Sequence, residues 1–290
     1  DIQSFNIILA AAGSLGDIDT CRQLYQWMRS EGRTNSSIKP DRITLRNMFQ
    51  AISLHSSSNQ QQHGGEVVEA AKECEQLVQQ YLTESSSHDA MAIYQALIHV
   101  WALADPWQAR AYLLDIAQQY RDSLPTDQQQ QPHHSPPPPP PPIDTLDWNR
   151  VISALAIQHG QPQAAYELLQ EFWTFTEDLQ QRLSSLQYPQ QKQRHQNFAA
   201  MTIPQPDLFS YNSILEGWAR LKDTRAAVEA NKIYTLIRRS ENLQPNIVTY
   251  TSAIKANGGD LDRVNKIAQE CLEAARQKDG EDDDYTVILD

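Results

Sequence analysis

The sequence predicts an all-α fold, an α-solenoid of about six helix-turn-helix repeats interrupted by low-complexity insertions. The first observation is a phrase that recurs, reading I-Q-S-F-N-I-I-L at Ile2–Leu9 and L-F-S-Y-N-S-I-L at Leu208–Leu215. Related phrases begin at Leu146 and Ile247. The second observation is a closing Pro-Asp or Pro-Asn, which occurs at Pro40-Asp41, Pro206-Asp207 and Pro245-Asn246. Repeats of this kind cannot bury their apolar faces alone, so neighbouring units must stack.

The first repeat spans Ile2–Asp41. Its first helix is predicted from apolar residues three or four apart, and Gly13 and Gly16 interrupt that pattern. Asp17 can cap a second helix, which Gly32 ends before Pro40 enforces an extended segment. The apolar faces of the two helices are Phe5, Ile8, Leu9 and Ala12, then Cys21, Leu24, Tyr25 and Met28.

The same plan predicts five further helix pairs. The second spans Arg42–Leu82, and the third spans Ala90–Tyr120 with Asp105-Pro106 as cap and first turn of its second helix. The fourth begins near Leu146, with a second helix from Pro162. The fifth and sixth begin at Leu208 and Ile247. Tryptophans at helical spacing are expected in the core: Trp101, Trp107, Trp148 and Trp218.

Low-complexity stretches divide the chain. They are predicted to be unable to bury enough apolar surface to order themselves. The longest is a Gln/Pro-rich linker over residues 125–144, which separates three repeats at 1–124 from three repeats at 145–281. Residues 282–290 are predicted to be an acidic tail or the start of a further repeat. The linker's run Pro136–Pro142 favours polyproline II and could recruit SH3- or WW-type protein partners, although a tolerated spacer is the simpler interpretation. Shorter insertions lie at Arg33–Ser37, His55–Gly65 and Gln187–Gln205.

Composition limits the function. The chain of 290 residues carries a net charge of −12, whereas nucleic-acid binding normally needs a basic surface. The segment Leu208–Ala256 is an exception, with seven basic and four acidic side chains. Three widely spaced cysteines, Cys21, Cys74 and Cys271, indicate core packing in a reducing compartment rather than a disulfide framework or a zinc site. No apolar stretch approaches the length of a membrane span, so we expect no membrane partner.

These phrases resemble the pentatricopeptide repeat family in its form without editing domains. The likeness is close in the units that start at Ile2, Leu208 and Ile247, fair in the fourth unit and poor in the second and third. The resemblance implies a right-handed superhelix that binds single-stranded RNA in a mitochondrion or chloroplast, acting in RNA stabilisation, processing or translation. The tetratricopeptide repeat also has two helices per unit, but its Trp-x-x-Leu-Gly pattern is not visible here.

The resemblance also implies which residues meet RNA. In the family, the fifth and last residues of a repeat contact one base edge, and the second residue packs against base faces. The base-reading residues would be Asn6 with Asp41 and Asn149 with Asp207, both for U, then Asn212 with Asn246 for C, and Thr251 for a purine. Arg46 and Gln95 at the fifth position of the second and third units do not fit this pattern. The base-packing residues would be Gln3, Ile43, Leu146, Phe209 and Val248.

Two simpler interpretations compete with RNA reading. Asn near a helix start and Pro-Asp in turns are common for local structural reasons, but three pairs in matching register favour a shared function. The acidic balance, the degenerate middle units and the proline run would also suit a protein–protein interaction scaffold of the helical-repeat type. A third alternative, which keeps RNA binding, is the RNA-binding arm of a larger enzyme such as a nuclease. No catalytic constellation, metal site or phosphate loop stands out. We therefore expect no enzyme activity, cofactor or small-molecule substrate.

Overall fold

The computed structural model describes residues 1–32, 34–58, 64–84, 90–124, 142–185, 203–221 and 224–281. Helices make up nearly all of these residues, and no β-strand occurs in the ranges described. The predicted all-α fold is therefore confirmed. No described helix is long and apolar enough to cross a bilayer. Most of the predicted linker, the acidic tail and most of the insertion at Gln187–Gln205 lie outside the described residues, together with Arg33 and residues 59–63.

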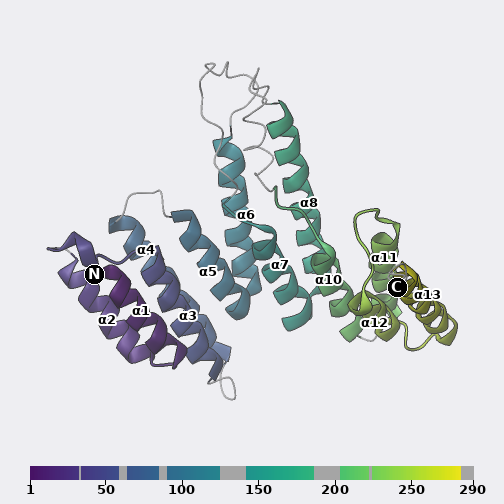
Figure 1. The fold of residues 1–290 in the computed structure, drawn as a ribbon, viewed down its shortest axis with the longest axis horizontal. Coiled ribbons are helices and arrows are strands. Elements are labelled where there is room, and N and C mark those ends of the chain that lie inside the picture. The colour runs from purple at the N-terminus through teal and green to yellow at the C-terminus, as the bar shows by residue number, and fades with distance from the viewer. Residues whose placement is uncertain are drawn as a thin grey trace, which may run out of the picture. The chain divides into compact units, whose positions relative to one another are not determined.

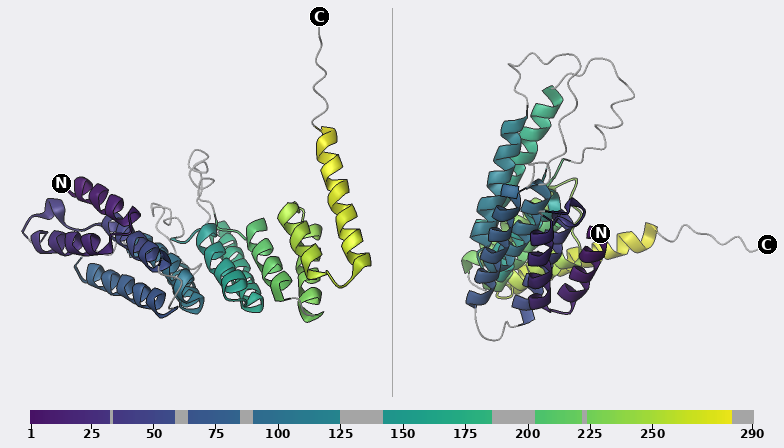
Figure 2. Two further views of the ribbon diagram at one scale, coloured as in Figure 1. Left: turned by 90° about the horizontal axis from the view of Figure 1, so that it is seen from below. Right: turned by 90° about the vertical axis from the view of Figure 1, so that its left-hand side faces the viewer.

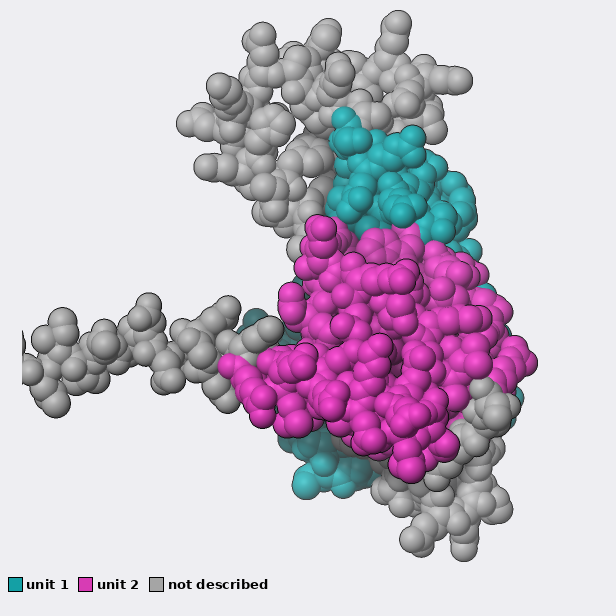
Figure 3. Space-filling model, turned by 90° about the vertical axis from the view of Figure 1, so that its right-hand side faces the viewer, with its two compact units in different colours: residues 1–151, 174–204 teal, residues 152–173, 205–290 magenta. Residues whose placement is uncertain are grey.

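The chain forms two compact units (Figure 3). Unit 1 comprises residues 1–151 and 174–204, and unit 2 comprises residues 152–173 and 205–290. The predicted boundaries at residues 124, 144 and 281 stay predictions.

Unit 1 contains three complete helix pairs (Figure 1). Its helices are α1 (Ile2–Ser14), α2 (Ile18–Glu31), α3 (Arg42–Ser58), α4 (Gly64–Glu84), α5 (Ala90–Ala104), α6 (Pro106–Ser123) and α7 (Thr145–Ser153), with a short 3₁₀ turn, η1 (Ser36–Ile38). The first helices α1, α3 and α5 pack on one another in a row, and each second helix packs beside the first helix of its own pair. This arrangement is the stacking that the repeated phrases predict.

Unit 2 repeats the arrangement. A π-helical turn, η3 (Ala154–Gln158), continues α7 and precedes α8 (Pro162–Ser185), of which residues 162–173 belong to this unit. Two pairs follow: α10 (Leu208–Leu221) with α11 (Thr224–Arg239), and α12 (Ile247–Ala256) with α13 (Leu261–Glu281). The row of first helices is η3, α10 and α12. Figure 2 shows α13 extending beyond the helices against which it packs.

Small residues let the first helices of unit 2 approach closely. A methyl group at Gly217 in α10 would lie 2.7 Å from the carbonyl oxygen of Ala156 in η3. Real side chains do not come this close, so the hydrogen side chain of glycine permits the crossing. The packing fixes α10 against η3, and α10 carries two of the predicted RNA-facing residues.

Most local predictions are confirmed. Asp17 accepts the backbone N–H of Thr20, Asp105 accepts that of Trp107, and α8 begins at Pro162 as expected. Cys21 and Cys74 are fully buried, whereas Cys271 is only partly covered.

The prediction that Trp107 belongs to the core is wrong, because its side chain is 49% exposed. Ala109 lies in the core two residues later. Two residues turn an α-helix by about 200°, which points Trp107 away from the core. Its ring lies near the guanidinium of Arg110 instead.

Candidate nucleic-acid interface

The first helices begin with a reciprocal cap supplied by the residue that closes the preceding repeat. In α12, Thr249 N–H donates to Asn246 Oδ1 at 3.1 Å, and Asn246 N–H donates to Thr249 Oγ1 at 3.1 Å. In α3, Asp41 and Thr44 exchange the same two bonds at 2.8 and 3.1 Å. Asp207 and Ser210 do so in α10 at 3.0 and 3.2 Å. Each cap satisfies backbone donors that the helix itself leaves without partners.

The fifth-position asparagines join two of these caps. Asn6 Nδ2 donates to Asp41 Oδ1 at 3.1 Å, and Thr44 Oγ1 donates to Asn6 Oδ1 at 2.7 Å. We call Asn6, Asp41 and Thr44 the first triad. The structure thus brings together two predicted residues that lie 35 positions apart in the sequence.

A second triad in unit 2 has the same geometry. Asn212 Nδ2 donates to Asn246 Oδ1 at 3.2 Å, and Thr249 Oγ1 donates to Asn212 Oδ1 at 2.8 Å. Asn212 and Asn6 are 7% and 6% exposed, so both amides are held inside the protein by the caps. The third member, Thr44 or Thr249, was not among the predicted site residues. The Thr three positions after the closing Asp or Asn was a signal that could have identified it.

The two triads leave different groups available to a ligand. In the first triad the internal bonds converge on Asp41 Oδ1, and Oδ2 has no partner among the described residues. In the second triad they converge on Asn246 Oδ1, and its Nδ2 has no partner among those residues. Asp41 is half-exposed and Asn246 is exposed. The first triad therefore offers a hydrogen-bond acceptor, and the second offers a donor.

Exposed apolar side chains lie one helical turn before the fifth positions. Ile43, Leu146, Phe209 and Val248 are 47%, 53%, 55% and 44% exposed, and Gln3 is exposed as well. Residues three apart share a helix face. Each predicted base-packing residue thus lies near the fifth-position side chain of its repeat along the helix surface.

The other predicted base-reading residues are described separately. Asn149 is 4% exposed in α7 and belongs to unit 1, whereas Asp207 caps α10 in unit 2. Thr251 is exposed, and its hydroxyl donates to the carbonyl of Ile247 at 2.6 Å. The pairing of Asn149 with Asp207 and the reading role of Thr251 stay predictions.

The third repeat has a cap that sequence reasoning missed. Asp147 N–H donates to Asp144 Oδ1, and Asp144 N–H donates to Asp147 Oδ2, both at 3.0 Å. Gln95, at the fifth position, donates from Nε2 to Asp147 Oδ2 at 3.0 Å. Burial raises the pKa of Asp147 to about 6. The spacing Asp-x-x-Asp at the end of the proline tract was the available signal.

The geometry defines a helical-repeat protein whose units are linked through closing residues that cap the next helix. Residues 203–260, which hold α10, α11 and α12, match the family model for the pentatricopeptide repeat domain. The chain therefore carries pentatricopeptide repeats in this segment, and the family prediction is confirmed.

Solved structures of two forms of one protein are similar over most of the chain. The pentatricopeptide repeat protein PPR10 in complex with an 18-nucleotide psaJ RNA element is 14% identical, with a TM-score of 0.43. The match covers 94% of this chain and 35% of that one. PPR10 from maize is 18% identical with a TM-score of 0.41, and the match covers 96% and 34% of the two chains. The chain thus spans about a third of the length of these proteins. The comparison with curated proteins gives no match.

Proposed function

We propose that this chain binds single-stranded RNA and reads individual bases with its triads. The observation that carries the proposal is the recurrence of one triad geometry in two repeats that present opposite hydrogen-bonding groups. A fold alone would require a capped helix start, but not a buried asparagine that fixes the rotamer of the capping residue. Helical repeats that read one base each with two or three side chains use this logic.

The chemistry matches two pyrimidines. Uracil carries an N–H donor at N3, and Asp41 Oδ2 is an acceptor. Cytosine carries an acceptor at N3, and Asn246 Nδ2 is a donor. The exposed side chains of Ile43, Phe209 and Val248 would pack against the base faces and add affinity with little base preference. With the RNA running 5′ to 3′ along the chain from N to C, the preferred site has the form U-n-n-U-C-purine.

The family resemblance supports a finer proposal. This chain would act on transcripts in a mitochondrion or chloroplast, in their stabilisation, processing or translation. The net charge of −12 makes strong sequence-independent RNA binding unfavourable, so base contacts must supply much of the affinity. The same charge favours the second candidate, a protein–protein interaction scaffold.

The test changes the base preference of one repeat. Asn246→Asp replaces the free amide donor with a carboxylate acceptor and should shift the fifth position of the RNA site from C toward U. We expect a change in discrimination of about 1–3 kcal/mol, by analogy with base-edge contacts in duplex DNA. The measurement is a titration of wild type and variant against short RNAs that differ only at that base.

Asn242→Asp provides the matched control. Asn242 is exposed in the connection that precedes α12, and the change adds the same charge outside the triad. It should leave the base preference unchanged. Equal affinity of the wild type for all four bases, or absence of binding at low salt, would refute RNA reading and favour the scaffold.

A further inference from the structure

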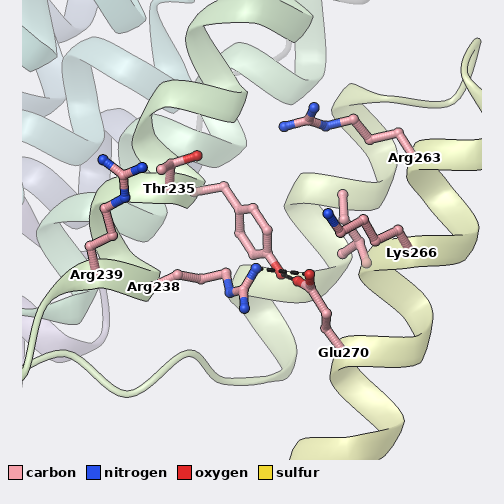
Figure 4. A pocket seen from close by; sticks show the side chains of 8 residues that line it. Thr235, Arg238, Arg239, Arg263, Lys266 and Glu270 are labelled. Carbon is pink, nitrogen blue, oxygen red and sulfur yellow. Dashed lines mark hydrogen bonds and ion pairs between the residues drawn. The ribbon is translucent and has the colours of Figure 1, made fainter.

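A second polar feature lies away from the triads, between the second helices of unit 2. A cavity of about 340 Å³ opens between α11 and α13 (Figure 4). Arg238 and Arg239 line it from α11, and Arg263 and Lys266 line it from α13. The predicted RNA-facing residues of this unit lie on the first helices α10 and α12 or cap their starts, so the two features are on different elements.

The carboxylate in this cavity is already engaged. Glu270 Oε1 accepts from Arg238 at 2.8 Å, and Glu270 Oε2 accepts from the Tyr234 hydroxyl at 2.6 Å. These bonds occupy both oxygens of Glu270 and neutralise Arg238. Figure 4 shows Arg238 of α11 reaching across to Glu270 of α13, the helix that also carries Arg263 and Lys266.

Three cations are left without a carboxylate. No ion pair is formed by Arg239, Arg263 or Lys266 within the described part of the chain, and the guanidinium of Arg263 donates to the amide oxygen of Asn231 at 3.1 Å. In a chain of net charge −12, such a cluster is a local excess of positive charge. Grouping like charges costs free energy unless an anion is bound among them.

The corresponding helices of unit 1 show what a purely structural interaction looks like. Between α2 and α4, Arg22 forms a two-pronged ion pair with Glu73, with its Nε at 2.8 Å from Oε1, and Arg29 donates to Gln80 at 2.8 Å. Both of these arginines have a partner on the facing helix. Packing of adjacent second helices therefore does not require the surplus found between α11 and α13.

We propose that the cavity between α11 and α13 is a phosphate-binding site. Guanidinium groups match the oxygens of a phosphate through two parallel hydrogen bonds, and the lysine adds a mobile point charge. Three uncompensated cations suit the charge of a phosphate ester or of two successive phosphodiesters better than that of a single carboxylate. The volume is at the lower end for small-molecule sites, which fits a nucleotide-sized group.

Two sources could supply the phosphate. One is the backbone of an RNA strand that crosses the second helices, and the other is a free phosphorylated small molecule. The site goes beyond the proposed function, because neither source needs the base-reading triads.

The test uses the full chain and two probes without bases. One is inorganic pyrophosphate, and the other is an abasic ribose-phosphate oligomer of about twelve units, a length within the range that single-stranded binding sites cover. The double variant Arg239→Gln/Lys266→Gln removes two exposed cations, and Arg263→Gln removes the third in a separate protein. Arg276→Gln, an exposed arginine further along α13 that does not line the cavity, is the matched control.

We expect the double variant to weaken probe binding by about tenfold or more, since hydrogen bonds to a charged group are among the stronger ones. The control should bind like wild type. For the oligomer, the slope of log affinity against log salt should fall by about 1.4, which is about 0.7 for each phosphate that the variant no longer neutralises. Pyrophosphate binding alone would identify a small phosphate ester as the ligand, and oligomer binding alone would identify RNA backbone.

Absence of binding by both probes at low salt would overturn the proposal. Equal binding by wild type, the double variant and Arg263→Gln would also overturn it. Base preference at Asn246 is measured in a separate experiment. If the protein binds the probes through the cavity but does not discriminate between bases, base reading is refuted and the phosphate site is not.

Discussion

Thr249→Val tests whether the second triad is a cooperative structural unit. Valine keeps the shape of threonine, which is 0% exposed, but it removes the hydroxyl that donates to Asn212 Oδ1 and accepts from Asn246 N–H. The Asn212 oxygen then lies buried without that partner. A buried polar group left unsatisfied costs about 1–3 kcal/mol, and removal of a helix cap costs about 1 kcal/mol. Because the Thr249 N–H still reaches Asn246, we expect a net decrease of about 2 kcal/mol in the free energy of unfolding.

The measurement is urea unfolding followed by circular dichroism. With a slope of about 2 kcal/mol per molar urea, the midpoint of the transition that reports on unit 2 should fall by about 1 M. Thr235→Val is the matched control, because the Thr235 hydroxyl donates only to the carbonyl of Asn231 in its own helix. Equal midpoints for the two variants would refute the claim that the triad is a stabilising network.

The other stability predictions concern packing and pH. Gly217→Ala should destabilise unit 2 by about 1–3 kcal/mol despite the better helix propensity of alanine, because its methyl group would overlap Ala156. Gly259→Ala is the control: its methyl group would meet no neighbour within 4 Å, so it should be nearly neutral in the same urea assay. Burial raises the pKa of Asp147 from 3.8 to about 6, so the folded state binds more protons than the unfolded state between these pH values. The free energy of unfolding should therefore fall by about 3 kcal/mol as the pH rises through this window. Asp147→Ser, which places here the residue type found at the equivalent position of α10, should abolish that fall in unfolding curves recorded from about pH 4 to 7, and an unchanged pH profile would contradict the assignment.

The sequence was most informative where local chemistry repeats. Asn6 with Asp41 and Asn212 with Asn246 could be predicted as pairs because the same residue types recur at the same spacing. The helix starts at Asp17 and Asp105 followed from capping chemistry alone. These features depend on residues within one repeat or at a fixed distance along the chain.

The cap formed by Asp144 and Asp147 was missed although its Asp-x-x-Asp spacing is local, because it follows a proline tract and lacks the Pro-Asp phrase. Features that depend on packing between helices could not be predicted. Trp107 has helical spacing but begins its helix on the outward face. The cationic cavity arises because Arg263 and Lys266 of α13 face α11, and periodicity cannot show which charged faces of two distant helices meet.

The double role of the closing residue limits how such a chain can change. Asn246 ends one repeat, where it would choose a base, and it also starts the next helix, where it must cap. Apart from glycine, which offers no side chain to a base, only residues with a short oxygen-bearing side chain do the second task well. The set of side chains open to base selection is therefore restricted by helix initiation before any RNA is considered. A substitution outside that set would alter the neighbouring repeat as well as its own, so new preferences can arise one repeat at a time only by exchange among asparagine, aspartate, serine and threonine.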